Sequence, residues 1–528
     1  MAATSEALIV PAAEPSAGTP KSVERKGSYG QILKSSALVG GSSVLKIAIG
    51  IVRTKAMAVL LGPAGFGLFG LYGSISDLWQ NIAGMGVNSS GVRQIAEAVG
   101  TSDNQRIAKT AAVLRRTSVI LGLLGAAVLV IFSRQVSQLT FGSKDRATAV
   151  ALLSLAVLLT LISNGQGALI QGMRRIADLA KMNVLGAFFG LCAAIPLVYF
   201  FRQNGVVPSL VAVAATTVVT SWWYSRKIEI DVPRVTVAEV RHEASALLKL
   251  GSAFMASGMM TMGVAYAVRI IVLRWVGYEA TGLYQSAWTL GGLYVAFILQ
   301  AMGADFYPRL TASVNNHEEC NRLVNEQTMV GLLLAGPGVL ATITFAPIVV
   351  TMLYSAKFAA AVAVLRWICL GAMLQVVTWP MGFIIVAKGK QNLFFASETA
   401  WTVVAVLLAV VCIHFFGLNG AGIAFFGSYI FHGFLTYPFA RMLSGFRWSL
   451  ANIRTGAVFF LLVGAVFIGH HVLPFAAATA LGGLALVFSC IYAVRTLVKL
   501  IPVADLPSPL QRLLMAFGLI QKVEAARA

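Results

Sequence analysis

Residues 36–61 read SALVGGSSVLKIAIGIVRTKAMAVLL, and this stretch decides how the rest of the chain is interpreted. It is long and apolar enough to cross a bilayer as one helix, which takes about 20 residues. It nevertheless carries three cations, Lys46, Arg53 and Lys55. Because each charge costs about 2.5–3.5 kcal/mol near the bilayer centre, three of them are hard to reconcile with a simple membrane anchor.

The spacing of these charges places two of them together. Lys46, Gly50 and Arg53 share one face of a helix, whereas Lys55 points about 200° away from Arg53. One interpretation is that a lysine reaches a lipid headgroup along its own aliphatic stem. The sharper interpretation is that the face of Lys46 and Arg53 lines a water-filled cavity that receives an anion.

The composition predicts the class of protein. The chain has 528 residues, of which 58% are hydrophobic and 11% charged, and its mean hydropathy is +0.80. Soluble domains are about 45–50% apolar and about 25% charged, so we expect an all-α polytopic membrane protein. The net charge of +20 does not indicate nucleic acid, because the basic residues lie in short loops between apolar spans.

Several kinds of chemistry are not expected from this sequence. The five cysteines contain no CxxC pair and the six histidines show no metal-ligand spacing, so we predict no metal and no cofactor. The sequence has no GxxxxGK[ST] loop, which argues against ATP hydrolysis by the chain itself. No predicted outer loop is long enough to hold paired catalytic carboxylates, so we do not expect an enzyme.

The apolar spans predict a topology. Fourteen of them are expected, and most Lys and Arg residues outside them fall in every second connection, so the positive-inside rule places both termini in the cytoplasm. Their predicted limits are 36–61, 68–92, 110–133, 147–172, 178–201, 205–225, 247–275, 281–308, 325–353, 360–386, 392–416, 419–440, 453–471 and 474–498.

An internal repeat organises these spans. When the sequence is shifted along itself so that Gly62 falls on Gly277, the run Gly67-Leu68-Phe69 falls on the run Gly282-Leu283-Tyr284. With the same shift, Phe200-Phe201-x-x-Asn204-Gly205 falls on Phe415-Phe416-x-x-Asn419-Gly420. Two copies of a six-span unit with the same orientation are therefore predicted, and transporters with parallel repeats bind their substrate between the two halves.

The repeat and the composition together divide the chain into six parts. We expect a disordered cytoplasmic tail (1–35), an N-lobe of six spans (36–225), a cytoplasmic linker helix (226–246), a C-lobe of six spans (247–441), two extra spans (453–498) and an amphipathic cytoplasmic tail (499–528).

Several motifs resemble a known family. They are LKIAIG around Lys46, TKAMAVLLGPAGFG from Thr54, VAYAVR ending at Arg269, GLYQ from Gly282 and ADFYPRLT around Asp305. They are similar to the polysaccharide transporter branch of the MATE-like MOP flippase superfamily, above all to Wzx-type O-antigen flippases. The resemblance implies a V-shaped, two-lobed bundle that moves undecaprenyl-pyrophosphate-linked oligosaccharides by alternating access. The two extra spans resemble instead the lipid II flippases of peptidoglycan synthesis.

The candidate site residues are the charges inside spans. Lys46, Arg53, Lys55 and Arg269 are expected to bind the pyrophosphate, since Lys and Arg both donate charge-assisted hydrogen bonds to phosphate. Asp77, Glu398 and Asp305 are candidates for ion coupling or charge pairing, and Asp305 can also pair with Arg309 at i+4. The aromatic residues that we consider for stacking on sugars, or for packing alone, are Trp79, Tyr266, Tyr284, Trp288 and Tyr294.

The predicted function is therefore a flippase of the bacterial inner membrane for an O-antigen or exopolysaccharide repeat unit. Its expected partners are the lipid-linked glycan, membrane lipids and the polysaccharide polymerase and ligase machinery. Two alternatives stay open, a lipid II-type flippase and a cation-coupled multidrug exporter of the same superfamily. An exporter of cationic drugs needs an acidic or neutral site, so the four cations within spans argue against it.

Overall fold

The structure is a computed structural model that describes residues 24–100, 103–228 and 237–500, and every regular element in these ranges is a helix. The first seven α-helices are α1 (Glu24–Gly84), α2 (Val87–Gly100), α3 (Asn104–Ile131), α4 (Ser133–Phe141), α5 (Ala147–Gly172), α6 (Ile176–Phe201) and α7 (Val206–Ser225). The other eight are α8 (Val237–Trp275), α9 (Tyr278–Ala312), α10 (His317–Leu353), α11 (Ala361–Ala387), α12 (Gln391–Phe416), α13 (Leu418–Ser444), α14 (Leu450–Val472) and α15 (Phe475–Leu500).

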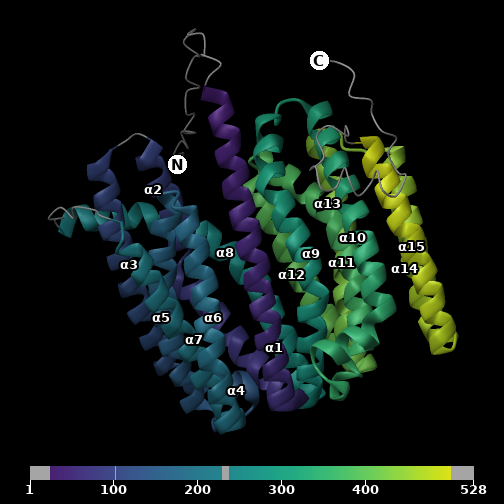
Figure 1. The fold of residues 1–528 in the computed structure, drawn as a ribbon, viewed down its shortest axis with the longest axis horizontal. Coiled ribbons are helices and arrows are strands. Elements are labelled where there is room, and N and C mark those ends of the chain that lie inside the picture. The colour runs from purple at the N-terminus through teal and green to yellow at the C-terminus, as the bar shows by residue number, and fades with distance from the viewer. Residues whose placement is uncertain (1–23, 101–102, 229–236, 501–528) are drawn as a thin grey trace, which may run out of the picture.

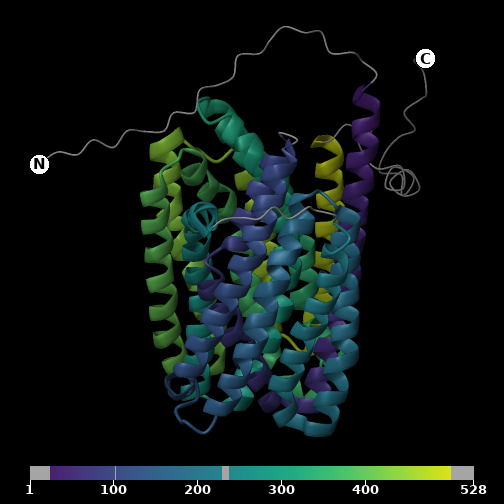
Figure 2. The same cartoon turned by 90° about the vertical axis from the view of Figure 1, so that its left-hand side faces the viewer.

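The helices form two groups that lie side by side. Figure 1 shows α2–α7 on the left and α9–α13 on the right, with α1 and α8 between them. We call α2–α7 with residues 62–84 of α1 the N-lobe, and α8–α13 the C-lobe. Helices α14 and α15 pack on α10 at the outer edge of the C-lobe (Figure 1). The helices run side by side in roughly one direction in both views, as Figure 2 shows.

The repeat predicted from the sequence is visible in the backbone. Gly62 and Gly277, which the repeat makes equivalent, both combine a positive φ with an extended ψ (65° and −178°, 107° and 179°). Arg202 and Gly417, at the same offset, have φ/ψ of 50°/−127° and 56°/−134°. The first and last residues of α6 correspond to those of α12 at this offset too. The two lobes therefore contain copies of one backbone design.

The two copies touch at equivalent residues. A Cβ on Gly67 would lie 2.6 Å from the backbone oxygen of Tyr278, and one on Gly282 would lie 1.8 Å from that of Pro63. Gly67 is the repeat partner of Gly282, and Pro63 is the partner of Tyr278, so each copy makes the same contact with the other. A self-complementary contact of this kind marks a pseudo-twofold axis. Only glycine allows the backbones of α1 and α9 to approach so closely there.

Helix α1 is divided by a kink at Gly62, whose φ/ψ values are not helical. Proline follows at position 63, which removes one hydrogen-bond donor and favours the break. The part that precedes the kink is the cationic stretch of the sequence analysis. Its residues Val44, Leu45 and Val52 are at least half exposed, so this first half of α1 lies beside the lobes rather than inside one.

The structure also fixes where the helices begin and end. Nine helical stretches among the described residues are long and apolar enough to cross a membrane, and one of them, residues 176–225, contains both α6 and α7. The chain is thus a multi-pass membrane protein, while the number of fourteen spans stays a prediction. Exposed apolar side chains such as Leu461 and Leu484 suit contact with lipid.

Three element bounds differ from the sequence expectation. Helix α1 begins at Glu24 rather than Ser36, because helical hydrogen bonding continues into a polar segment that water can solvate. The second predicted span is broken at Met85 and Gly86, both with positive φ. The expected linker helix is continuous with the next span, since α8 runs from Val237 to Trp275. Residues 1–23, 229–236 and 501–528 of the predicted tails and linker lie outside the described part.

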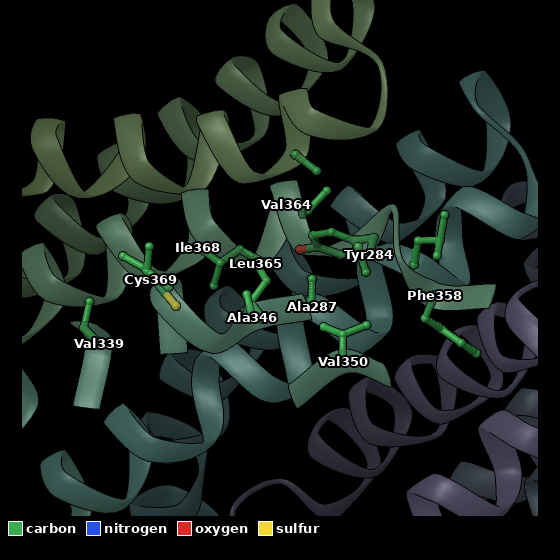
Figure 3. Close-up of a cluster of buried hydrophobic side chains, with 14 of the residues drawn as sticks. Tyr284, Ala287, Val339, Ala346, Val350, Phe358, Val364, Leu365, Ile368 and Cys369 are labelled. Carbon is green, nitrogen blue, oxygen red and sulfur yellow. The ribbon is translucent and has the colours of Figure 1, made fainter. Parts of the chain in front are cut away.

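Helices α10 and α11 of the C-lobe pack against each other through a hydrophobic core. In Figure 3, Ala346 and Val350 of α10 lie close to Leu365 and Ile368 of α11, and all four are at most 1% exposed. Between helices in lipid, such contacts stabilise mainly by van der Waals packing, because lipid tails are as apolar as the side chains. Ile368, in this core, also lines the cavity described next.

Candidate functional site

A cavity of about 700 Å³ lies among the helices of the C-lobe. Its wall is formed by α8, α9, α11, α12 and α13, with Ile47 from the first half of α1. Most of the lining is apolar or aromatic and includes Tyr284, Trp288, Trp401, Phe425 and Tyr429. Arg269 on α8 is the one charged residue in the lining that the structure describes.

Arg269 is held by neutral groups. Its Nε donates to Oε1 of Gln285 at 2.7 Å, and its Nη1 donates to the backbone oxygen of Ala265, also at 2.7 Å. The guanidinium carbon lies 5.9 Å from the ring centre of Tyr284 and 5.8 Å from that of Trp288, within the range of cation–π attraction. These contacts fix the orientation of the guanidinium but leave its positive charge in place.

The charge of Arg269 is buried, since the residue is only 6% exposed. No carboxylate lies within ion-pair distance of it among the described residues. A buried charge costs several kcal/mol unless a counter-ion and hydrogen bonds compensate it. The cavity is therefore suited to a negatively charged ligand. The indole N–H of Trp401, buried at the same wall without a described hydrogen-bond partner, is a second available donor.

The position of Gln285 depends on the other lobe. A Cβ on Gly70 of α1 would lie only 2.7 Å from Cγ and from Oε1 of Gln285. Gly70 therefore makes the space that the Gln285 side chain fills. The two residues are repeat partners, so they meet at the pseudo-twofold axis as Gly67 and Gly282 do. Because Gly70 has no side chain, it leaves room across the axis for Gln285, which holds Arg269.

A second cavity, of about 310 Å³, lies in the N-lobe. Its wall combines residues of the second half of α1, the start of α2, α3 and α5, together with Met262 of α8. The lining is polar, and it includes Asp77, Gln80, Asn81, Asn88, Ser89 and Asn164. Met262 lines both cavities, so the two adjoin at this residue.

Asp77 connects the two cavities electrostatically. Asp77 lies in the second half of α1, is exposed there and lines the N-lobe cavity. It is near enough to attract the guanidinium of Arg269 without forming a direct ion pair. An empty site can therefore keep its two opposite charges partly compensated across the gap between the lobes.

The other predicted site residues lie outside these two linings. Lys46 and Lys55 are exposed, and Arg53 is partly buried. Among the described side chains of that half-helix, Ile47, the neighbour of Lys46, lines the C-lobe cavity. The roles of Lys46, Arg53 and Lys55 stay predictions. Glu398 lies 3.9 Å from Nε2 of His432, whose ring contacts those of Trp401 and Tyr429 in the cavity wall. The side chain of Asp305 lies outside the described part of the chain.

The aromatic residues predicted to stack on sugars also fall into two groups, those that line a cavity and those that do not. Tyr284 and Trp288 line the C-lobe cavity. The indole of Trp79 donates to the backbone oxygen of Gly125 at 2.9 Å, and the hydroxyl of Tyr266 is hydrogen-bonded to that of Thr140. These two have structural partners instead, and the Tyr294 side chain is not described. Sequence reasoning missed Gln285, Asn81, Asn88 and Asn164, whose signal is an uncharged amide within or at the end of an apolar helix.

The chain matches one protein family and is similar to known flippases. A family model described as "Polysaccharide biosynthesis protein" matches residues 56–363, more than half of the chain. The lipid III flippase of Escherichia coli K12 is 22% identical over 414 residues, which cover 76% of this chain and 95% of that protein. The Shigella flexneri lipid III flippase matches to the same extent.

Two solved structures share the fold. The lipid II flippase MurJ, in an inward closed conformation, aligns with a TM-score of 0.65 at 12% identity, covering 87% of this chain and 99% of that one. An inward-facing multidrug resistance MATE transporter of the MOP superfamily aligns with a TM-score of 0.63 at 18% identity, covering 76% and 98%. The chain therefore shares the fold of these two transporters.

Proposed function

The chain belongs to the polysaccharide biosynthesis protein family, and from that premise we propose that it is a flippase for undecaprenyl-pyrophosphate-linked oligosaccharides. Its substrate would be an O-antigen or exopolysaccharide repeat unit, moved across the bacterial inner membrane by alternating access of the two lobes. Both termini would then lie in the cytoplasm, and the polymerase and ligase machinery would receive the product.

The observation that carries this proposal is the buried Arg269 in the C-lobe cavity. A pyrophosphate is the most difficult part of such a substrate to move through hydrocarbon, because its charges lose their hydration. Arg269 supplies a fixed positive charge with its orientation set by Gln285 and Ala265. A guanidinium can bind phosphate oxygens through two parallel hydrogen bonds. The aromatic wall around it excludes water and strengthens this attraction.

The three cations of α1 have a place in the same mechanism. Movement of its first half about the kink at Gly62 would carry Arg53 and Lys46 over the mouth of the cavity that Ile47 already reaches. Lys55 would face the opposite side, where a headgroup is the expected partner. The cations would then shield the pyrophosphate during the passage, and Asp77 would attract Arg269 again once the substrate has left.

A peptidoglycan precursor of the lipid II type is the second candidate substrate. It is favoured by the presence of α14 and α15, which lie outside the repeat, and by the likeness to MurJ over 87% of the chain. A cationic drug is disfavoured, because Arg269 would repel it from an otherwise neutral wall.

The test is transport by the full chain in proteoliposomes. Three substrates are compared, a fluorescent undecaprenyl-pyrophosphate oligosaccharide, fluorescent lipid II and a cationic dye. We expect the first to be translocated by the wild type, and Arg269→Ala to slow it by about thirtyfold or more, since an unpaired buried partner of a charge pair costs about 2–5 kcal/mol. Arg93→Ala, which removes an exposed arginine of α2, is the matched control.

The outcomes separate the candidates. Movement of lipid II alone would establish the peptidoglycan function in place of the one proposed. Movement of the dye alone would establish a drug exporter. Equal transport by wild type and Arg269→Ala would remove the cavity from the mechanism.

A further inference from the structure

The polar N-lobe cavity has no role in binding a pyrophosphate, because its lining contains a carboxylate, Asp77, and no cation among the described residues. We propose that this cavity is the binding site for the uncharged, hydroxyl-bearing sugar that adjoins the pyrophosphate. The inference rests on the proposed function and divides the substrate between the lobes. The C-lobe cavity takes the charged part, and the N-lobe cavity takes the sugar.

The chemistry of the lining favours sugar hydroxyls. Gln80, Asn81 and Asn164 each offer an amide N–H₂ that donates and a carbonyl oxygen that accepts. A hydroxyl group also donates one hydrogen bond and accepts others, so it can satisfy both ends of such an amide. Oδ1 of Asn81 is buried and has no hydrogen-bond partner among the described residues. A ligand hydroxyl at that point would satisfy an acceptor that the protein leaves unpaired.

Two other ligands fit this lining less well. A bare cation such as Ca²⁺ needs oxygen ligands at about 2.3–2.6 Å on all sides, and the Asp77 carboxylate and the amide oxygens could supply some of them while the amide N–H₂ groups could not. The cavity, at about 310 Å³, is also far larger than such a cage. An anion would be repelled by the exposed carboxylate of Asp77. An uncharged polar ligand meets neither difficulty.

The position of the cavity relative to Arg269 suits one continuous substrate. Gly70, Asp77 and Asn81 share a face of α1, at i, i+7 and i+11. Gly70 lies against Gln285, the residue that holds Arg269, and Asp77 follows two helical turns later, about 10 Å along the axis. Met262 belongs to both linings. A ligand bound to Arg269 can therefore extend along this face of α1 into the N-lobe cavity.

The experiment measures binding to the purified full chain in detergent. The probes are farnesyl pyrophosphate and the same molecule carrying one glucose, galactose or N-acetylglucosamine. In the wild type we expect at least one of the sugars to lower the dissociation constant about fivefold to tenfold relative to bare farnesyl pyrophosphate, the range of one or two net hydrogen bonds. Asn164→Leu should abolish this gain and leave the affinity for bare farnesyl pyrophosphate unchanged. Asn392→Leu, an exposed asparagine of α12 outside both cavities, is the control.

Each result is decisive. Loss of the gain in Asn164→Leu, with the gain kept in Asn392→Leu, supports the assignment. A wild type that binds farnesyl pyrophosphate without preferring any of the three sugars overturns it, and so does an Asn164→Leu variant that keeps the gain. A sodium-dependent affinity that Asp77→Asn removes would identify a cation site instead. If the wild type binds no probe at all, the proposed function itself fails.

Discussion

The two lobes are built from one repeat, yet their cavities have opposite chemistry. The C-lobe cavity is aromatic and holds a buried cation, Arg269, whereas the N-lobe cavity is rich in amides and holds a carboxylate, Asp77. The two cavities do not occupy equivalent places, since Gln285 and Trp288 of the C-lobe cavity correspond to Gly70 and Gly73, which do not line the N-lobe cavity. A duplicated backbone can thus keep its symmetry while the cavities of its two lobes differ in place and in chemistry.

The largest loss of pyrophosphate binding should follow from a substitution that gives Arg269 a carboxylate counter-ion within the protein. Gln285→Glu places a carboxylate where Oε1 now accepts from Nε at 2.7 Å. The new pair would compete with the substrate anion and weaken farnesyl pyrophosphate binding by roughly 10-fold to 100-fold, from about 1.5–3 kcal/mol for a charge-assisted hydrogen bond. Titration calorimetry measures the change. Gln375→Glu, elsewhere in the same lining, is the control, and an equal loss there would argue against specific pairing.

A smaller loss of transport should follow from adding a methyl group at Gly70, where the Gln285 side chain now fills the space at the pseudo-twofold axis. Gly70→Ala forces the Gln285 side chain aside, because its Cβ would lie within 2.8 Å of three atoms of that side chain. We expect transport to fall about tenfold, the value of roughly one hydrogen bond to a charged group. Gly73→Ala, three residues on, meets nothing within 4 Å and should leave transport unchanged.

A double variant sharpens this prediction. If Gly70 acts only through Gln285, then Gly70→Ala should have no further effect in a Gln285→Ala background. Additive losses in the double variant would contradict the proposed connection across the axis. Transport rates in proteoliposomes, normalised to the amount of folded protein, provide the measurement.

Removing the carboxylate of the N-lobe cavity should have a weaker effect of the opposite sign. Asp77→Asn removes an attraction to Arg269 and a repulsion of the incoming anion, so bare farnesyl pyrophosphate should bind about twofold to fivefold more tightly at low salt. The gain should shrink at high salt, because the charges interact through a solvated gap. Asp145→Asn, an exposed residue outside both cavities, should show no gain. Weaker binding of the bare probe by Asp77→Asn would refute the division of roles.

The smallest change, a change in Tm, should follow from a substitution in the exposed ion-pair cluster of Arg322, Glu319 and Glu326, which lines neither cavity. Arg322 donates to Glu319 at 2.8 Å and to Glu326 at 2.6 Å, and the hydrogen bond from Arg322 lowers the pKa of the Glu319 carboxyl. A carboxyl with a lowered folded-state pKa stabilises above its unfolded pKa, and this contribution is lost as the pH falls through its folded pKa. Arg322→Ala should therefore lower Tm slightly at pH 7, and this difference should disappear once the pH has fallen below the lowered folded-state pKa of Glu319. Transport should be unchanged, and a transport defect would show that this region is coupled to the cavities.

Much of the fold could be predicted from the sequence. Apolar runs located the helices, and the constant offset between matching motifs identified the two copies that the backbone torsions of Gly62 and Gly277 display. Element ends were less accurate. The break at Met85 and Gly86 carries no apolar signal, and the polar start of α1 at Glu24 is helical without being part of a span.

The site was predicted only in part, for a physical reason. Arg269 was a candidate because a charge inside an apolar run is costly, and the structure places it in the lining of the C-lobe cavity. The cations of α1 carry the same signal, but where they point depends on how the half-helix before Gly62 lies against the lobes, which periodicity does not encode. The Gly70–Gln285 contact was missed, although the repeat contained it. Residues that are repeat partners at a twofold axis meet each other, as Gly67 and Gly282 also do.

We expect the C-lobe cavity to recognise negative charge through Arg269. The most direct test compares the binding of farnesyl pyrophosphate with that of farnesol, for the wild type and for Arg269→Gln, by titration calorimetry. We expect the wild type to bind the pyrophosphate at least about tenfold more tightly than the alcohol, and Arg269→Gln to abolish this difference. An Arg269→Gln variant that still prefers the pyrophosphate as strongly as the wild type would contradict it.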